Sequence, residues 1–370
     1  MLREHLLETA NEDAWRRWLP ASRSVFGSLG YARICESFRG SVPRLYVVEM
    51  DSGSICHPLL LRPLHDLPFQ IEVRSQWDAG TPDYTGPLET GSISESLETL
   101  QQRRREMIRR EGIVAEFAHL HPWSSGRKLL GDGSSHDRDI IWIDTTLSDE
   151  DLLRKHVEHA CRKNIQKATR EGVRIFAKND DDHIREFYRI YSGTMQRNNA
   201  LERYAFSLEF FLAFRDELAD GARFVFAEHG GRIIAATLYL HDDENVYSFL
   251  GGADAEFNQL RPNNLMIWET TAWARRTGKK RLVLGGGYKG LDGIFRFKST
   301  FSRLRQPFYI YKKVHLERDY HLLDQSFRNH YGLKDENVDY FPSYRFTRTA
   351  AGESSGPVEN HGPVSSMAPL

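Results

Sequence analysis

Hydrophobic and polar residues alternate most regularly in the second half of the chain. Residues 223–228, 232–240 and 245–250 are rich in aromatic and β-branched side chains, and turn residues separate these three segments. This pattern predicts three antiparallel strands joined by hairpins. Apolar residues then recur at helical spacing between capping candidates at 263–264 and Gly278, so we expect a helix there.

A short apolar strand predicted at residues 281–284 runs directly into a glycine-rich loop. Residues 285–293 contain five glycines, which let the backbone adopt positive φ and approach a ligand without a Cβ in the way. The segment 294–301 follows and places Lys298 between aromatic residues shortly after the loop. The loop and this lysine are therefore candidates for a binding and reaction site.

The first half of the chain has weaker but recognisable patterns. Residues 11–19 predict an amphipathic helix, and residues 45–62 predict a β-hairpin. Two prolines and several turn residues predict that residues 77–88 form a loop over the sheet. The remaining predicted elements of this half are a helix at 94–112 and strands at 113–120 and 139–144.

Between these two regions and at the end of the chain, helical patterns dominate. We expect one continuous helix from Ser148 to about residue 172, because apolar residues form a stripe along it. A second helix is predicted at 184–195, and a strand at 308–314 leads to a last helix around 320–331. Residues 347–370 are rich in Gly, Ser and Pro with few apolar side chains, which predicts a disordered tail.

Composition and charge argue against several classes of function. Lys and Arg number 50 and Asp and Glu 51, so a formal net charge of −1 creates no global field toward DNA or an anionic membrane. No apolar run approaches the ~18 residues of a spanning helix, and the N-terminus lacks a signal-peptide core, so we expect a cytoplasmic protein. Three widely spaced cysteines favour neither a disulfide framework nor a metal site.

Basic residues are concentrated near the end of the helix predicted at 94–112. Five arginines lie within two turns there, and a solvated face that interacts favourably with the helix dipole explains them most simply. A contact to phosphate or RNA is the alternative. The five are Arg103, Arg104, Arg105, Arg109 and Arg110.

Six short motifs follow one another in an order that is found in a known family. Together they resemble the FemA/FemB/FemX superfamily of Fem-like transferases, over roughly residues 10–340. The predicted β-β-β-α-β order of residues 223–284 is that of the second half of the acyltransferase fold called GNAT. The motifs are DYTGPL at 83–88, RKNIQKA at 162–168, LGGAD at 250–254, RPNNL at 261–265, LGGG at 284–287 and FKSTF at 297–301.

The resemblance implies an α/β (α+β) fold of two tandem GNAT-like domains. Mixed sheets are expected to be flanked by helices, with a cleft between or beside the domains. We place the first domain at residues 1–146 and the second at 147–317. A C-terminal helix at about 318–345 is expected to pack back on the first domain.

The resemblance also implies roles for individual residues. In FemX-like enzymes the lysine of the Phe-Lys pair is proposed to stabilise the aminoacyl ester as it becomes an oxyanion, and we carry this catalytic role to Lys298. The alternative is a strand lysine that snorkels to solvent. Arg203, with Tyr204 beside it, stands where Fem-like ligases have an arginine that contacts substrate phosphates. A surface ion pair is the alternative for Arg203.

Other substrate contacts are expected around the same cleft. Tyr84 matches an aromatic residue that precedes Gly-Pro in family members, although a simple surface turn also explains it. Tyr247 and Tyr288 are further candidates, for which core or rim packing is the alternative. The remaining predicted contacts are Gly286, Gly287 and Phe297.

The donor is inferred from the loop that precedes the helix at 263–278. Acetyl-CoA enzymes of this fold bind pyrophosphate on backbone N–H groups of a glycine-containing loop at a helix N-terminus. Residues 258–265 contain no glycine, and Pro262 removes one N–H donor. This argues against CoA and favours aminoacyl-tRNA, although the chain lacks the long helical arm and the basic charge of some Fem ligases.

These inferences lead to three functional hypotheses. The first is transfer of an aminoacyl group from aminoacyl-tRNA, as co-substrate, to an amine of a cell-wall precursor or peptide-like metabolite, without a further cofactor. The second is an N-acyltransferase that uses acyl-CoA or an acyl carrier in polysaccharide or natural-product biosynthesis. The third is a non-catalytic GNAT-like binding module.

Overall fold

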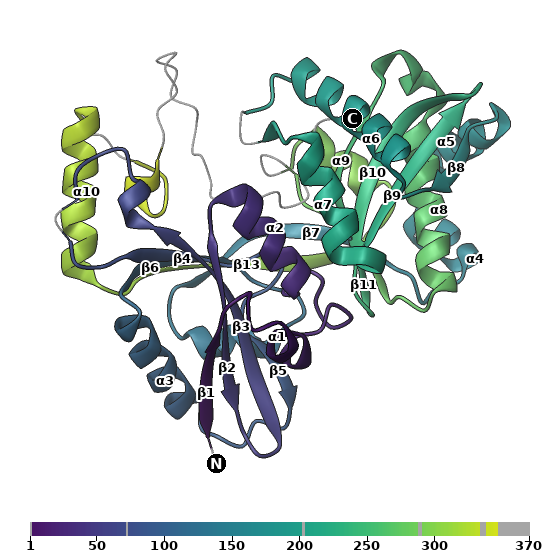
Figure 1. Cartoon of the computed structure of the whole chain (residues 1–370). Helices are drawn as coiled ribbons and strands as arrows, with labels where there is room; N and C mark the ends of the chain where they lie inside the picture. The colour runs from purple at the N-terminus through teal and green to yellow at the C-terminus, as the bar shows by residue number, and fades with distance from the viewer. Residues whose placement is uncertain (1, 72, 202–203, 288–290, 334–337, 347–370) are drawn as a thin grey trace. The chain divides into compact units, whose positions relative to one another are not determined.

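The computed structural model describes residues 2–71, 73–201, 204–287, 291–333 and 338–346. Within them the chain forms two compact units (Figure 1). The first unit contains the described residues up to Leu19, Phe26–Asp137 and those from Tyr309 onward, and the second contains Pro20–Val25 and Arg138–Phe308. The predicted boundaries lie at 146 and 317. The predicted disordered tail lies outside the described residues.

The first unit contains a mixed sheet. Its strands follow the order β1, β2, β3, β4, β6 and β13, with β5 paired to β3. The β4–β6 pair is parallel, and the other pairs are antiparallel. The strands are β1 (Arg3–Leu7), β2 (Val42–Glu49), β3 (Gly53–Pro63), β4 (Trp77–Gly80), β5 (Leu88–Gly91), β6 (Ile113–His119) and β13 (Arg305–Val314).

Alternation along β2 explains why helices cover both faces of this sheet. Leu45 and Val47 pack against α1 (Glu12–Trp18) and α2 (Leu29–Arg39), whereas Tyr46 and Val48 lie in a cluster with α3 (Leu97–Arg110). Successive side chains of a strand point to opposite faces, so one strand supplies two cores. The C-terminal helix α10 (Glu317–Tyr331) buries its apolar side chains against β6.

The second unit also contains a mixed sheet, in the order β7, β12, β11, β10, β9, β8. Only the β11–β12 pair is parallel among the pairs of this unit. The predicted strands at 223–228, 232–240, 245–250 and 281–284 all form. The strands are β7 (Ser134–Asp144), β8 (Arg174–Ala177), β9 (Ala222–His229), β10 (Arg232–His241), β11 (Asn245–Ala253) and β12 (Arg281–Gly285).

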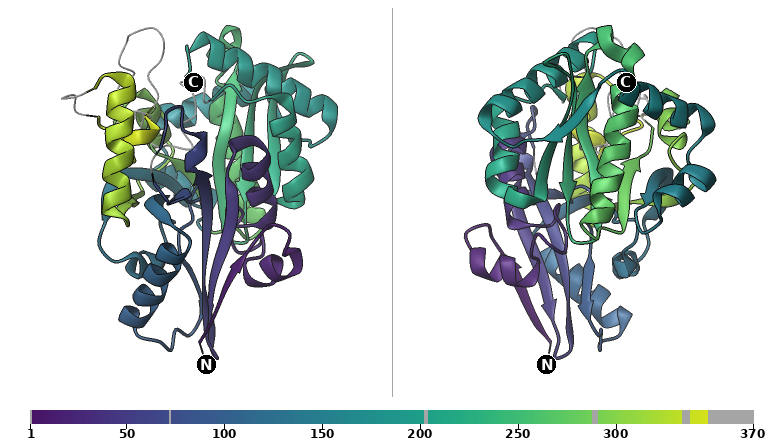
Figure 2. Two further views of the ribbon diagram at one scale, coloured as in Figure 1. Left: turned by 60° about the vertical axis from the view of Figure 1, so that its left-hand side comes forward. Right: turned by 90° about the vertical axis from the view of Figure 1, so that its right-hand side faces the viewer.

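Helices cover both faces of this second sheet, as both views of Figure 2 show. Phe224 of β9 packs against Phe187 of α6 (Asp181–Arg197), with ring centroids 5.0 Å apart. The neighbouring Val225 belongs instead to the core cluster that contains α5 (His159–Arg170) and α8 (Pro262–Arg276). The remaining helices are α4 (Asp149–Asp151), α7 (Leu208–Leu218) and α9 (Gly293–Ser299). The predicted α/β class with mixed sheets flanked by helices is therefore confirmed.

Two local predictions are wrong. The helix expected from 148 to 172 is divided, because a π-helical turn at Leu152–His156 ends at Val157, whose backbone is extended. The loop expected at 77–88 begins with β4, a short strand that pairs with both β3 and β6. The alternative of a strand lysine at position 298 is also excluded, because Gly293–Ser299 is helical.

A buried carboxylate holds the C-terminal segment of the first unit. Asp78 of β4 is fully buried and accepts hydrogen bonds from Arg62 Nε at 2.5 Å and Arg345 Nε at 2.8 Å. Arg345 also donates to the carbonyl of Pro63 at 2.7 Å. Removing one partner of a buried ion pair leaves the other charge without compensation, which is strongly destabilising.

We therefore expect Asp78→Asn to lower the free energy of unfolding by roughly 3 kcal/mol, measured by urea denaturation. Glu12→Gln is a matched control, because Glu12 pairs with Arg16 at 3.3 Å in an exposed site. The control is expected to cost less than about 1 kcal/mol. Equal losses in the two variants would contradict the structural role of Asp78.

Candidate active site

The end of β12 is the position where the second sheet opens. The parallel pairing of β11 and β12 covers Asn245–Tyr247 and Arg281–Val283, whereas β11 continues to Ala253 and β12 to Gly285. The ladder therefore stops before the carboxyl ends of both strands. In open α/β sheets such carboxyl ends are where ligands bind. Gly285, with φ of 79°, turns the chain out of the sheet at this point.

Helix α9 presents Lys298 to this strand end. The side chain of Asp292 caps the helix by accepting a hydrogen bond from the Phe295 N–H at 2.9 Å. Lys298 is fully buried, and its Nζ donates to the carbonyl oxygen of Gly286 at 2.8 Å. The amine is thus fixed against the glycine loop, and the snorkelling alternative is excluded.

The environment of Lys298 changes its protonation. Burial lowers the pKa of the Lys298 amine to about 7, while the Asp292 carboxylate raises it and the Arg138 guanidinium lowers it further. A buried amine loses the hydration that stabilises its charged form. Both forms are therefore populated near neutral pH, which is a property typical of functional lysines.

Arg138 is a second cation at this position, and no pattern in the sequence pointed to it. Its Nη1 donates to the carbonyl of Gly287 at 3.0 Å, so two basic residues hold consecutive carbonyls of the loop. A Cβ at position 286 would lie 2.9 Å from the Cδ atom of Arg138. Any larger residue at 286 would therefore displace the Arg138 side chain. In the sequence, Arg138 was only the polar residue before a predicted strand.

Phe297 anchors helix α9 to the core of the second unit. Its half-buried ring meets the Phe301 ring edge-on, with centroids 5.4 Å apart. Arg305 stacks over Phe295 at 5.3 Å and donates to Ser299 Oγ at 2.9 Å. Packing and hydrogen bonds thus fix both ends of the short helix, and with it the position of the Lys298 backbone.

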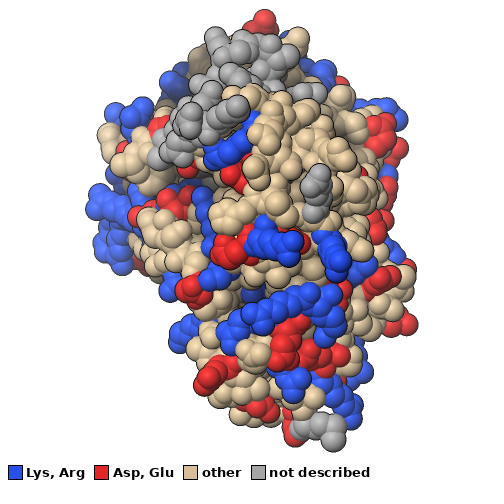
Figure 3. Space-filling view, turned by 90° about the vertical axis from the view of Figure 1, so that its left-hand side faces the viewer, with Lys and Arg blue, Asp and Glu red and all other residues tan. Residues whose placement is uncertain are grey.

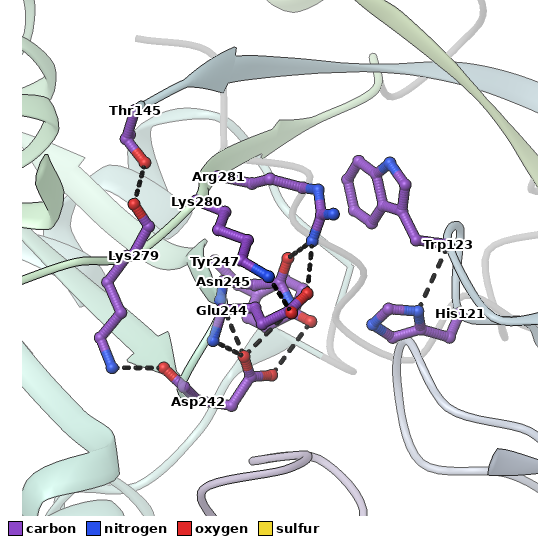
Figure 4. A network of polar contacts seen from close by, with 10 residues as sticks. All are labelled: His121, Trp123, Thr145, Asp242, Glu244, Asn245, Tyr247, Lys279, Lys280 and Arg281. Carbon is purple, nitrogen blue, oxygen red and sulfur yellow. Dashed lines mark hydrogen bonds and ion pairs between the residues drawn. The ribbon is translucent and has the colours of Figure 1, made fainter. Parts of the chain in front are cut away.

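Tyr247 lies in a buried polar network at the start of β11, which Figure 4 shows. Its hydroxyl donates to Asp242 Oδ2 at 3.3 Å, and Asp242 Oδ1 accepts from the N–H groups of Asn245 and Glu244 at 2.8 and 3.0 Å. Burial raises the pKa of Asp242 to about 6, although these hydrogen bonds lower it. Tyr247 therefore has a partner within the hairpin between β10 and β11.

Tyr84 and Tyr204 are both buried. Tyr84 belongs to the first unit, has a positive φ of 44° and packs against Phe26 with ring centroids 5.7 Å apart. Tyr204 is 8% exposed, and its backbone carbonyl accepts from the Tyr191 hydroxyl at 2.9 Å. A surface-turn role for Tyr84 is thereby excluded. The predicted contacts Arg203 and Tyr288 lie outside the described residues.

Beside Tyr84, the first unit contains a buried polar cluster that the sequence analysis missed. Tyr31 donates to Asp83 Oδ2 at 2.6 Å, and Arg39 Nη2 donates to the Tyr31 hydroxyl at 3.1 Å. Burial raises the pKa of Tyr31 well above its usual value, so the phenol stays protonated. Only Asp83 could have been found, because it begins the DYTGPL motif.

The loop before α8 has few groups for binding a pyrophosphate. Arg261 adopts a left-handed conformation with φ of 59°, and Pro262 occupies the first turn of α8. The N–H of Asn264 is already bonded to the Arg261 carbonyl at 3.1 Å. Helix N-termini bind phosphate through N–H groups that have no intrahelical partner, and this turn has lost two of them.

Neither a metal centre nor a membrane span is found in the described part of the chain. No three His, Cys, Asp or Glu side chains there are grouped so that they could hold a metal ion. Among the same residues, no helix combines the length and the apolar composition that crossing a bilayer requires.

The geometry at the end of β12 and the β-β-β-α-β order define a GNAT-type domain. Residues 155–299 match the family model described as an acetyltransferase (GNAT) domain, and this range includes Lys298. No curated protein matches the sequence. The matched domain supports the predicted acyltransferase class.

Solved structures extend this similarity to most of the chain. The crystal structure of FemX has a TM-score of 0.66 at 14% identity, covering 86% of this chain and 99% of FemX. A conserved protein of unknown function from Bacteroides thetaiotaomicron has a TM-score of 0.57 at 14% identity, with coverages of 84% and 99%. The chain therefore has the fold of the Fem-like proteins, as predicted.

A third structure shares this fold. The C-terminal domain (DUF2156) of a proposed lysylphosphatidylglycerol synthetase from Agrobacterium fabrum has a TM-score of 0.53 at 13% identity. The match covers 86% of this chain and 97% of that domain. The fold thus recurs in proteins of very different sequence.

The buried amine of Lys298 generates a prediction about stability. Its folded pKa of about 7 lies below the ordinary lysine value of 10.5, so the unfolded chain binds more protons between these values. The stability of the wild type should therefore rise with pH across this window. At lower pH the full cost of burying the protonated amine should be present. Lys298→Met removes the amine at nearly constant shape.

We expect Lys298→Met to be more stable than the wild type by on the order of 2 kcal/mol at about pH 6. The difference should shrink as the pH rises from about 7, and it should disappear only above about 10.5, where the lysine is neutral in both states. Urea denaturation at several pH values measures it. A difference that is independent of pH would show that folding does not lower the pKa of Lys298.

Proposed function

We propose that the protein transfers an aminoacyl group, from aminoacyl-tRNA, to an amine of a cell-wall precursor or a peptide-like metabolite. The observation that carries this proposal is the buried Lys298 amine, held by the Gly286 carbonyl where β11 and β12 separate. A donor of this kind is found in the cytoplasm, which we propose as the location of the protein.

The proposed reaction is an aminolysis of an ester. The acceptor nitrogen attacks the ester carbonyl carbon, and the carbonyl oxygen becomes an oxyanion. When the tetrahedral intermediate collapses, the bond to the ribose oxygen breaks, and the proton lost by the amine ends on that oxygen. A fixed cation in a dry site stabilises the oxyanion more than it does in water, because water screens the charge. The Lys298 ammonium is proposed to supply this cation.

The loop carbonyls position that cation. Lys298 donates to the carbonyl of Gly286 at 2.8 Å, and Arg138 donates to that of Gly287 at 3.0 Å. These hydrogen bonds fix the ammonium against the loop backbone. Gly286, Gly287 and Phe297 are proposed to line the substrate site beside this amine. Tyr84, Tyr204, Tyr247, Arg203 and Tyr288 remain proposed substrate contacts of the Fem-like resemblance.

The donor assignment is supported by the loop before α8. Pro262 lacks an N–H, and Asn264 has already used its own on the Arg261 carbonyl. Acyl-CoA remains a second candidate donor, because the matched family model is an acetyltransferase domain.

Two donors offered in parallel test this proposal. The purified protein is incubated with mixed amine acceptors and either radiolabelled aminoacyl-tRNA or acyl-CoA. Transfer of label from the tRNA to the amine, abolished when the donor is first treated with RNase, supports the first candidate. Release of free CoA supports the second. Transfer from neither donor would contradict the assignment as an acyltransferase and support a binding module.

Replacement of Lys298 tests the catalytic role. We expect Lys298→Met to lower kcat/KM by roughly 100-fold or more, since the loss of one group that stabilises an oxyanion has effects of this size. The melting temperature of the variant serves as the folding control. Unchanged kcat/KM in a folded Lys298→Met protein would exclude Lys298 from the chemistry.

The pH profile identifies the active form of the amine. Because the pKa of Lys298 is about 7, a requirement for the ammonium predicts that kcat/KM falls above about pH 7. Lys298→Arg keeps its charge at every accessible pH, so its profile should lack this falling limb. Deprotonation of the acceptor amine raises both profiles equally. The opposite result is that kcat/KM of the wild type rises near pH 7 while that of Lys298→Arg does not. This result would identify the neutral Lys298 amine as a general base.

A further inference from the structure

The structure divides the arginine run of α3 into three environments. Arg103 and Arg110 form ion pairs at the surface with Glu4 and Glu111, at 3.6 and 3.1 Å. Arg104 is buried and pairs with the buried Glu116. The remaining two arginines line a cavity. They are Arg105 and Arg109, one helical turn apart and therefore on one face of the helix.

This cavity lies entirely within the first unit and has a volume of about 250 Å³. Helix α3 forms one wall, residues around Leu129 form another, and β13 forms the third. Lys313 of β13 lines it and pairs with Asp132 at 2.7 Å. Three exposed or half-buried cations, Arg105, Arg109 and Lys313, thus line the same cavity as one carboxylate.

Arg104 and His315 line the floor of the cavity, and both contact a buried carboxylate. Glu116 is fully buried, accepts a hydrogen bond from Arg104 and lies 3.1 Å from His315 Nε2. The Arg104 guanidinium lowers the pKa of Glu116, so this carboxylate stays charged despite its burial. The Arg104 charge is therefore balanced within the floor. The positive excess that faces the cavity comes from the wall residues.

We infer that this cavity binds a small phosphorylated ligand through its phosphate or diphosphate group. A guanidinium offers two parallel N–H donors that match phosphate oxygens, and two guanidiniums with a lysine match a multiply charged anion better than a single carboxylate. Arg105 uses its Nε and Nη2 on the Gln102 side chain at 3.2 and 2.8 Å, so the Nη1 side of its guanidinium is the one that we expect to bind phosphate. Tyr311 and Ile108 add apolar surface for an organic group.

The surroundings favour a small ligand over RNA. RNA binding needs a basic stripe that follows many phosphates. On the face that carries α3 and α10, Lys and Arg side chains instead alternate with Asp and Glu side chains (Figure 3). The two outward arginines are also neutralised by Glu4 and Glu111. The positive excess is thus confined to a hollow, and the hollow holds little more than a phosphate with part of its attached group.

This inference does not depend on the proposed transfer reaction. The cavity belongs to the first unit, and none of its lining residues takes part in the Lys298 site of the second unit. A failure to find transfer activity would therefore not contradict the predicted phosphate binding. A failure to find phosphate binding would not contradict the proposed transfer reaction.

Calorimetric titration of the full-length protein at low salt tests the site. The probes are inorganic pyrophosphate, glucose 1-phosphate and sulfate. We expect pyrophosphate to bind better than sulfate. Tighter binding of glucose 1-phosphate than of pyrophosphate would identify a phosphorylated organic molecule as the ligand, and the reverse order would identify a free diphosphate. Binding of both phosphates weaker than about 1 mM would overturn the inference.

Two double variants of the same helix separate a site from general charge. Arg105→Gln with Arg109→Gln should weaken binding of the better phosphate probe at least about tenfold, because charge-assisted hydrogen bonds are lost. Arg103→Gln with Arg110→Gln removes the same charge from the same helix outside the cavity and should change binding less than about twofold. Equal weakening by both pairs would overturn the inference.

A third variant should act in the opposite direction. Asp132→Asn removes the carboxylate that competes for Lys313, so we expect phosphate binding to tighten about threefold. Melting curves check that all variants fold, which their exposed positions favour. If an RNA hairpin binds with sensitivity to Arg105 and Arg109 while neither phosphate probe does, the arginines form a nucleic-acid contact, and the inference is wrong.

Discussion

The hydrogen bond between the Lys298 amine and the Gly286 carbonyl is the interaction on which the candidate active site depends. It joins a short helix to the end of a strand at the point where two parallel strands separate. A buried amine is costly, and the protein keeps it although an apolar side chain would fill the same space at lower cost. Such a cost is common where a group is needed for chemistry.

The packing of the second unit fixes the positions of the Lys298 amine and the Gly286 carbonyl. Sheet alternation gives β9 two faces, so that α6 and α7 pack on one side and α5 and α8 on the other. This double cover fixes the strand ends, and the Phe297–Phe301 contact fixes α9. The two glycines at the end of β12 contribute differently: Gly285 adopts a positive φ, and Gly286 allows the Arg138 side chain to approach closely.

The sequence predicted the strands around residues 223–284 because alternation, hairpin turns and a glycine stop all agreed there. It also predicted that Lys298 matters, through a resemblance to Fem-like proteins. It did not predict helix α9, because the aromatic residues at 295, 297 and 301 also fit a strand and only the Asp292 cap reveals the helix. Arg138 could not be recognised, since its partner Gly287 is 149 residues away. Tyrosine is equally common in cores and binding sites, so Tyr84 and Tyr247 could not be assigned from sequence.

Strand β13 pairs with β6 although residues 120–304 lie between the two strands in the chain, so the first sheet is built from segments that are far apart in the sequence. During synthesis on the ribosome, the second unit emerges complete while β6 still presents an unpaired edge. Unpaired edges attract other strands, and nascent chains fold roughly in order of emergence. Translation therefore delays closure of the first sheet until the C-terminal segment appears, and the N-terminal half depends on that late strand for its protection from aggregation.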